Sequence, residues 1–142
     1  MKRLIFTVSL IACLFSVPAF ARDRNIPDAL NSFYKTFKNA QNINWSQVDD
    51  MLRIGFTLDN RRQYAYYSGE ELVVLATEIK AEALPEALKQ QLAKDYKGFV
   101  ISQAYELNKD GAKEYCVVVD DASRHITLKG KTKLTICFEQ RK

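Results

Sequence analysis

Residue types on which catalysis and metal binding depend are scarce in this sequence of 142 residues. It has one histidine, His125, together with five glycines and three cysteines. A structural zinc site takes about four Cys or His ligands at close spacing, and the few candidates here are far apart. No glycine belongs to a phosphate-cradling loop, and no G-x-S-x-G nucleophile elbow occurs. The sequence therefore predicts no catalytic residues, no metal site and no cofactor.

The single histidine could serve a serine hydrolase only with partners close to it in the chain. Ser123 precedes His125 by two positions, with Asp120 and Asp121 just upstream. Such close neighbours rarely converge in a Ser-His-Asp triad, so we expect His125 to be a structural residue at a strand end. A hydrolase that uses His125 is the alternative to be tested.

The longest apolar run lies at the N terminus. Two basic residues precede an uncharged stretch over residues 4–17 that is rich in Leu, Ile, Phe and Val. Pro18 follows, and Ala19 and Ala21 place small residues at the positions that a signal peptidase accepts. This order is typical of a cleavable secretory signal, whereas a membrane span needs about 20 apolar residues. We expect cleavage after Ala21, which makes residues 1–21 a signal peptide and the mature chain periplasmic or secreted.

A lipoprotein is the alternative for this segment. Residues 10–13 (LIAC) loosely resemble a lipobox that ends at Cys13. Leu14 and Phe15 would then follow the lipidated cysteine, where a polar tether is expected. Cleavage after Ala21 is therefore the favoured interpretation.

The mature chain has a nearly neutral charge balance. Loss of Lys2 and Arg3 from the 21 basic residues leaves 19, against 17 acidic residues. Nucleic-acid binding relies on basic side chains that neutralise phosphates, so this balance gives it no support. No later stretch is apolar enough to span a membrane. The composition predicts one compact exported domain over residues 22–142.

Cleavage also leaves two cysteines, Cys116 and Cys137. An even count in an exported protein suggests a disulfide, and both residues lie in predicted strands that could be neighbours. The alternative is a pair of thiols that never meet. Cys116 in particular lies in an apolar strand, where a buried and unreactive thiol is common.

One segment occurs twice. Residues 26–30 (IPDAL) return as residues 84–88 (LPEAL), at an offset of 58. Each copy has a proline suited to the start of a helix and an acidic residue suited to its first turn. Apolar residues then recur at helical spacing, and Gly98 is a plausible cap after the second helix. The predicted apolar stripes are Ile26, Leu30, Phe33, Tyr34 and Phe37 in the first helix, and Leu84, Leu88, Leu92 and Tyr96 in the second.

After each helix the apolar period changes to that of strands. We expect hairpin turns at Ser68-Gly69 and Lys129-Gly130. The predicted fold is α+β, a tandem repeat of a helix plus an antiparallel β-meander, with the helices packed on the sheet. The repeats cover residues 26–79 and 84–139 of one domain. The predicted strands are 42–45, 51–58, 63–67 and 72–75 in the first repeat, and 100–107, 115–119, 125–128 and 134–138 in the second.

Aromatic residues cluster on the strands of the first repeat. Along one strand Tyr64 and Tyr66 point to one face and Tyr67 to the other, with Trp45 upstream. Tyr and Trp are favoured at recognition surfaces because they bury a large rigid area and keep a polar group. These four residues are the predicted partner-binding residues. Cross-strand packing that only stabilises the sheet is the alternative.

The order of short motifs resembles that of a known family. Residues 42–45 (NINW), 54–56 (IGF), 66–70 (YYSGE) and 84–88 (LPEAL) follow one another. In this order the chain resembles the PepSY-like, beta-lactamase-inhibitor-like family of exported bacterial proteins. The resemblance implies tandem helix-plus-sheet repeats and brings no catalytic residues. Lys129 departs from it, because the family often has an acidic residue before this turn glycine.

These observations predict an exported, non-enzymatic binding or inhibitor-like protein that acts on a protein partner in the periplasm. The alternative is a small-ligand carrier or sensor with a pocket between the helices and the sheet.

Overall fold

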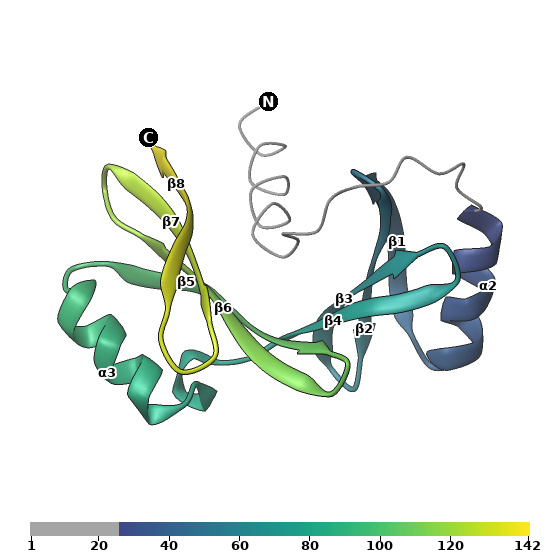
Figure 1. Cartoon of the computed structure of the whole chain (residues 1–142), viewed down its shortest axis with the longest axis horizontal. Coiled ribbons are helices and arrows are strands. Elements are labelled where there is room, and N and C mark those ends of the chain that lie inside the picture. Colours follow the sequence, from purple (N-terminus) through teal and green to yellow (C-terminus); the bar gives the residue numbers. More distant parts are fainter. Residues whose placement is uncertain (1–25) are drawn as a thin grey trace. The chain divides into compact units, whose positions relative to one another are not determined.

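A computed structural model describes residues 26–142 (Figure 1). The predicted signal peptide, its cleavage site and Cys13 lie outside these residues. Two compact units make up the described part. The N-terminal unit comprises residues 26–77 with 108–112, and the C-terminal unit comprises Glu78–Leu107 and Lys113–Lys142. Among these residues, no helix has both the length and the apolar character needed to cross a membrane.

The strands are hydrogen-bonded in the order of the chain, β1 to β8. The pairs within each unit from β1 to β4 and from β6 to β8 are antiparallel. With one α-helix in each unit, the structure confirms the predicted α+β class. The origin of the two units as repeats stays a prediction from the recurring segments.

The N-terminal unit begins with one helix, which is followed by four strands of eight residues each. The strand β2 has the bounds that its alternating pattern predicts. The other strands extend beyond their predicted bounds, because the hydrogen-bonded ladder continues through polar residues that carry no apolar signal. The elements are α2 (Ile26–Thr36), β1 (Gln41–Val48), β2 (Met51–Leu58), β3 (Arg61–Ser68) and β4 (Glu71–Glu78).

Aromatic rings fill the space between α2 and its sheet. The Phe33 ring is fully buried, with its centroid 5.1 Å from that of Phe37 and 4.9 Å from that of Phe56. Tyr34, which we placed on the same stripe, is 52% exposed, and Ala29 is buried instead. At 3.6 residues per turn, the residue after Phe33 points about 100° away from it. The predicted stripe is therefore wrong at Tyr34.

The C-terminal unit has the same kinds of element, preceded by a short 3-10 helix. Pro85 is the N-cap of α3, one residue before the position we expected. The C-cap is Tyr96, and Gly98 follows two residues later with a left-handed φ of 89°. The elements are η1 (Ala81–Ala83), α3 (Glu86–Asp95), β5 (Val100–Lys109), β6 (Ala112–Asp120), β7 (Arg124–Gly130) and β8 (Thr135–Arg141).

Aliphatic side chains form the core of this unit. The predicted residues Leu84, Leu88 and Leu92 are all buried and pack with the sheet, and Tyr96 is partly buried against them. Burying such a side chain stabilises the fold by roughly 2 kcal/mol. The other buried residues in this cluster are Ala104, Val117, Val119, Ile126 and Leu128 of the sheet, and Leu134 just before β8.

The turn between β7 and β8 lies later than predicted. Gly130, expected in the turn, pairs with Tyr115 as the last residue of β7. The chain reverses over residues 131–133 instead. A Cβ atom on Gly130 would collide with the carbonyl group of Lys133. This glycine therefore serves a close backbone approach beside the strand.

Candidate functional sites

The three predicted tyrosines alternate along β3 as expected. Tyr64 lies opposite Gly55 of β2, and Tyr67 lies opposite Leu52. Leu52 and Tyr67 belong to the core beneath α2, so Tyr64 and Tyr66 point to the other face of the sheet. A register irregularity between Tyr66 and Tyr67 interrupts the pairing with β4.

Burial separates the four predicted partner-binding residues. Tyr66 is 0% exposed and Tyr67 is 2% exposed, whereas Trp45 is 49% exposed and Tyr64 is intermediate. Trp45 lies opposite Ile54 of β2, on the face that α2 covers. Trp45 and Tyr64 therefore occupy opposite faces, and the four residues do not share one surface. Their role in binding stays a prediction.

Two arginines accompany Tyr64, and our sequence reasoning did not include them. The guanidinium carbon of Arg53 lies 5.2 Å from the centroid of the Tyr64 ring, and that of Arg62 lies 5.4 Å from it. Cations at this distance are attracted by the ring face. The alternation of β3 could have indicated Arg62, which is two residues before Tyr64. We call Arg53, Tyr64 and Arg62 the Tyr64 cluster.

A carboxylate network surrounds the single histidine. Nδ1 of His125 lies 2.8 Å from Oδ1 of Asp120, and the Ser102 hydroxyl donates to Oδ2 at 2.6 Å. The Lys142 ammonium lies 3.3 Å from Oδ1. Burial raises the pKa of Asp120, but the hydrogen bonds from Ser102 and His125 outweigh it and hold the pKa below its usual value. The network thus favours an ionised carboxylate.

The residues of the hydrolase alternative have other partners. The Ser123 hydroxyl donates to Oδ1 of Asp121 at 3.1 Å, and the same oxygen accepts from the backbone N–H groups of Ser123 and Arg124. These bonds form an Asx-type turn before β7. In a catalytic triad the histidine bridges the serine and the acid. The bonds of Ser123 instead tie it to a turn.

The described residues offer no group of three or more His, Cys, Asp or Glu side chains that could hold a metal ion.

The two cysteines lie on strands that are not neighbours. Cys116 is buried in β6 and Cys137 is exposed in β8, and β7 lies between these strands. Two strand spacings amount to roughly 9.5 Å, and a disulfide requires Cα atoms within about 7 Å. The two strands, which the sequence left open as possible neighbours, are therefore not adjacent, and both cysteines are free thiols. Burial raises the pKa of the Cys116 thiol to about 12.

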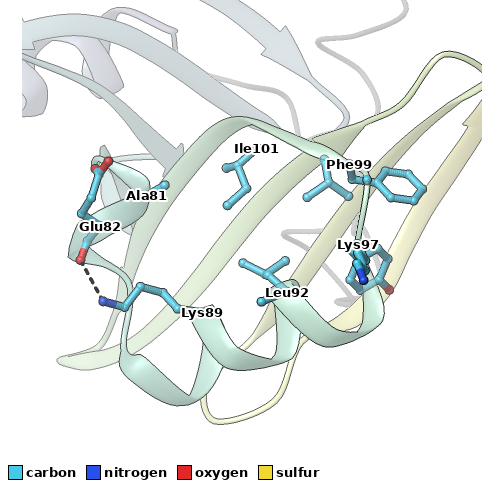
Figure 2. Close-up of a pocket in the computed structure, with 11 residues that line it drawn as sticks. Ala81, Glu82, Lys89, Leu92, Lys97, Phe99 and Ile101 are labelled. Atoms are coloured by element: carbon cyan, nitrogen blue, oxygen red, sulfur yellow. Dashed lines mark hydrogen bonds between the residues drawn. The ribbon is translucent and has the colours of Figure 1, made fainter.

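The C-terminal unit contains an apolar pocket of about 450 Å³ beside α3 (Figure 2). Leu92 of α3 and Ile101 of β5 face each other across it. A pocket between helix and sheet is part of the small-ligand alternative, but no residue pattern in the sequence indicates its lining. The other lining residues are Ala81, Glu82, Lys89, Ala93, Tyr96, Lys97, Gly98, Phe99 and Val119.

Solved structures share this fold. A DUF2874 family protein from Bacteroides uniformis superposes with a TM-score of 0.68 at 16% identity, over 86% of this chain and 90% of that one. A BLIP-like protein from Bacteroides fragilis gives 0.62 at 17% identity, over 85% and 88%. A candidate periplasmic protein from Bacteroides eggerthii gives 0.70 at 15% identity, over 87% and 90%.

These likenesses establish the fold of the chain. They agree with the beta-lactamase-inhibitor-like part of the resemblance, and the PepSY-like part stays a prediction. No protein-family model matches the sequence, and no curated protein matches it either.

Proposed function

We propose that this chain is an exported, non-enzymatic binding protein that acts on a protein partner in the periplasm. Its fold is that of the BLIP-like and candidate periplasmic proteins, and residues 1–21 have the pattern of a cleavable signal peptide. Descent from a duplicated PepSY-like unit is part of this proposal. The observation that carries it is the Tyr64 cluster on the N-terminal unit.

The chemistry of the cluster suits recognition of a protein surface. Tyr and Arg are the residue types that, with Trp, dominate binding hot spots. Arg53 and Arg62 hold their cations over the ring of Tyr64, which places the N–H donors of two guanidinium groups beside one aromatic side chain. A guanidinium group binds a carboxylate through two parallel hydrogen bonds. The expected partner therefore presents acidic side chains, and the cluster would inhibit or hold it by contact alone.

Site-specific photocrosslinking tests this proposal. A photoreactive phenylalanine analogue at position 64 should crosslink a discrete protein in the periplasm of the native host. The same analogue at Tyr34, exposed on α2, should not crosslink that protein. Binding to the purified partner is then measured by calorimetry.

Two adjacent arginines supply a matched pair of variants. Arg62→Glu should weaken binding about thirtyfold, the effect of losing a hot spot. Arg61→Glu changes the same charge on the opposite face of β3 and should have little effect. Equal losses in both variants, or the same crosslinks at positions 34 and 64, would contradict the proposed site.

The pocket beside α3 favours a second candidate function, a small-ligand carrier or sensor. Its volume of about 450 Å³ lies within the range of roughly 300–1,000 Å³ typical of ligand sites. Native mass spectrometry of the protein purified from its own periplasm would reveal a retained small molecule. An unliganded mass in every preparation, together with no ligand in a binding screen, would count against this candidate.

A further inference from the structure

The pocket beside α3 has an apolar floor built from three elements. Leu92 comes from α3, Ile101 from β5 and Val119 from β6. Phe99 closes one end, where its ring centroid lies 5.7 Å from that of Tyr96. Ala93, an exposed residue of α3, also lines the pocket and contributes only a methyl group. The shape and chemistry of these walls suit an apolar chain.

The buried side chains in the core cluster beside α3 are all aliphatic, so they leave space there. In the N-terminal unit, three phenylalanine rings with centroids 4.8–5.1 Å apart fill the corresponding space under α2. A cavity beside α2, lined in part by Ala29 and Leu52, measures only about 10 Å³. The pocket beside α3 is therefore much larger than the cavity described beside α2.

At the end of the pocket near η1, Lys89 forms an ion pair with Glu86, and the Glu82 side chain also lines this end. Lys89 lies 3.0 Å from a carboxylate oxygen of Glu86, and its ammonium group donates to the backbone carbonyl of Glu82 at 3.5 Å (Figure 2). This lysine is thus held by groups of the chain itself.

The other end carries a cation that is not offset. Among the described residues, no carboxylate lies within ion-pair distance of Lys97, which lines the pocket beside Phe99. A second cation there, Arg124, packs on Phe99 with a distance of 4.9 Å to the ring centroid. Its guanidinium group is engaged by Asp121 at 3.3 Å and Glu139 at 3.8 Å. Lys97 is therefore available to a ligand.

We propose that this pocket binds an anionic amphiphile, with an alkyl chain over Leu92 and Ile101 and a carboxylate at Lys97. This inference rests on the small-ligand candidate and is independent of a protein partner. Charge complementarity selects the head group, because Lys97 is the lining cation that has no carboxylate beside it among the described residues, and it lies at the end away from the Glu82 carboxylate. The apolar floor favours an alkyl tail, since each methylene buried there should raise the affinity about fourfold.

Probes that share one alkyl chain test the head group. Decanoate, decan-1-ol and decylamine are titrated below their aggregation concentrations into the isotope-labelled mature chain, and amide shifts are followed by NMR. Decanoate should bind most tightly and decylamine least, with shifts at Leu92, Ile101 and Lys97. Octanoate, two methylenes shorter, should bind about fifteenfold more weakly.

Two variants test the location. Ala93→Phe adds a ring to the pocket lining from an exposed helix position and should abolish decanoate binding. The matched control is Lys35→Phe at the exposed position 58 residues earlier, on α2, which should leave binding unchanged. Lys97→Glu should weaken decanoate about fivefold or more and leave decan-1-ol unaffected. Circular dichroism and thermal unfolding verify that each variant is folded.

The outcomes distinguish failure of the proposed ligand class from failure of the small-ligand candidate itself. If decan-1-ol bound as tightly as decanoate and Lys97→Glu changed neither, the anionic class would be wrong and the pocket would remain a ligand site. If no probe bound, or Lys35→Phe reduced binding as much as Ala93→Phe, the pocket beside α3 would not be the site, and the small-ligand candidate would fall with it.

Discussion

Asp120 and His125 face each other across the β6–β7 ladder, with Oδ1 of the acid 2.8 Å from Nδ1 of the imidazole. The other carboxylate oxygen accepts a hydrogen bond of 2.6 Å from Ser102 on β5. Lys142, the last residue, approaches the same carboxylate at 3.3 Å. One acidic side chain thus joins three strands and the C terminus of the chain.

Asp120→Asn should lower the free energy of unfolding by about 2 kcal/mol at pH 7, because hydrogen bonds to a charged group each contribute roughly 1.5–3 kcal/mol. The pKa of Asp120 is depressed in the folded state. Its contribution is therefore complete above the ordinary carboxyl pKa and is lost as the pH falls through the folded pKa. Denaturant titrations across this pH range should show the wild-type advantage disappearing in acid.

Asp49→Asn provides the control for this experiment, since Asp49 is exposed in a turn with a φ of 49° that asparagine also adopts. Two outcomes would show that the network does not stabilise the fold. One is that Asp49→Asn lowers the free energy of unfolding as much as Asp120→Asn does. The other is that the difference between wild type and Asp120→Asn persists in acid.

Phe33 and Tyr34 are adjacent aromatic residues with opposite environments, and their alanine variants should differ sharply. Phe33 is fully buried between Phe37 and Phe56, so Phe33→Ala should cost about 3–5 kcal/mol. Tyr34→Ala should cost at most about 1 kcal/mol, the contribution of one edge-to-face ring contact. Equilibrium denaturation of both variants measures the difference, and similar losses would contradict the burial pattern of α2.

The elements of the fold could be predicted because local patterns determine them. The period of Leu88 and Leu92 indicated the buried face of α3, and strict alternation gave β2 its bounds. The turn after β7 was misplaced because a glycine reads as a turn in sequence. Only the structure shows that Gly130 accommodates the carbonyl of Lys133 from within a strand.

The candidate sites were less predictable because they depend on contacts between strands. Alternation correctly placed Tyr64 and Tyr67 on opposite faces, but it could not show that Tyr66 is fully buried. The pairing of Arg53 with the Tyr64 ring depends on the β2–β3 register. The pocket beside α3 exists because side chains do not fill the volume there. No residue pattern in a sequence indicates such an unfilled volume.

The two thiols should differ strongly in reactivity. Cys137 is exposed, whereas Cys116 is fully buried and its pKa is raised to about 12. Since the thiolate is the reactive form, a maleimide should label Cys137 in the folded protein and reach Cys116 only after unfolding. Peptide mapping by mass spectrometry locates the label, and Cys137→Ser should remove native labelling. Rapid native labelling of Cys116, or a Cys116–Cys137 disulfide in the unreduced protein, would overturn this arrangement.

Two strand glycines allow a direct comparison of rigid and flexible surroundings. A Cβ atom at Gly130 would collide with the backbone carbonyl of Lys133, which can move only if the β7–β8 turn is distorted. At Gly55, the Cβ atom would lie 2.7 Å from Oδ1 of Asn44 and 3.2 Å from a ring carbon of Tyr64, both on side chains that can rotate.

Gly130→Ala should therefore cost about 3 kcal/mol, as overpacking against fixed atoms does. Gly55→Ala should cost about 1 kcal/mol or less, because alanine also reduces the conformational freedom of the unfolded chain. Hydrogen exchange should show lost protection in β8 for the Gly130 variant alone. If Gly55→Ala lowered the free energy of unfolding more than Gly130→Ala, the side chains of the Tyr64 cluster would be as rigid as backbone atoms. The proposed recognition surface would then be preorganised, and binding would require little ordering of its side chains.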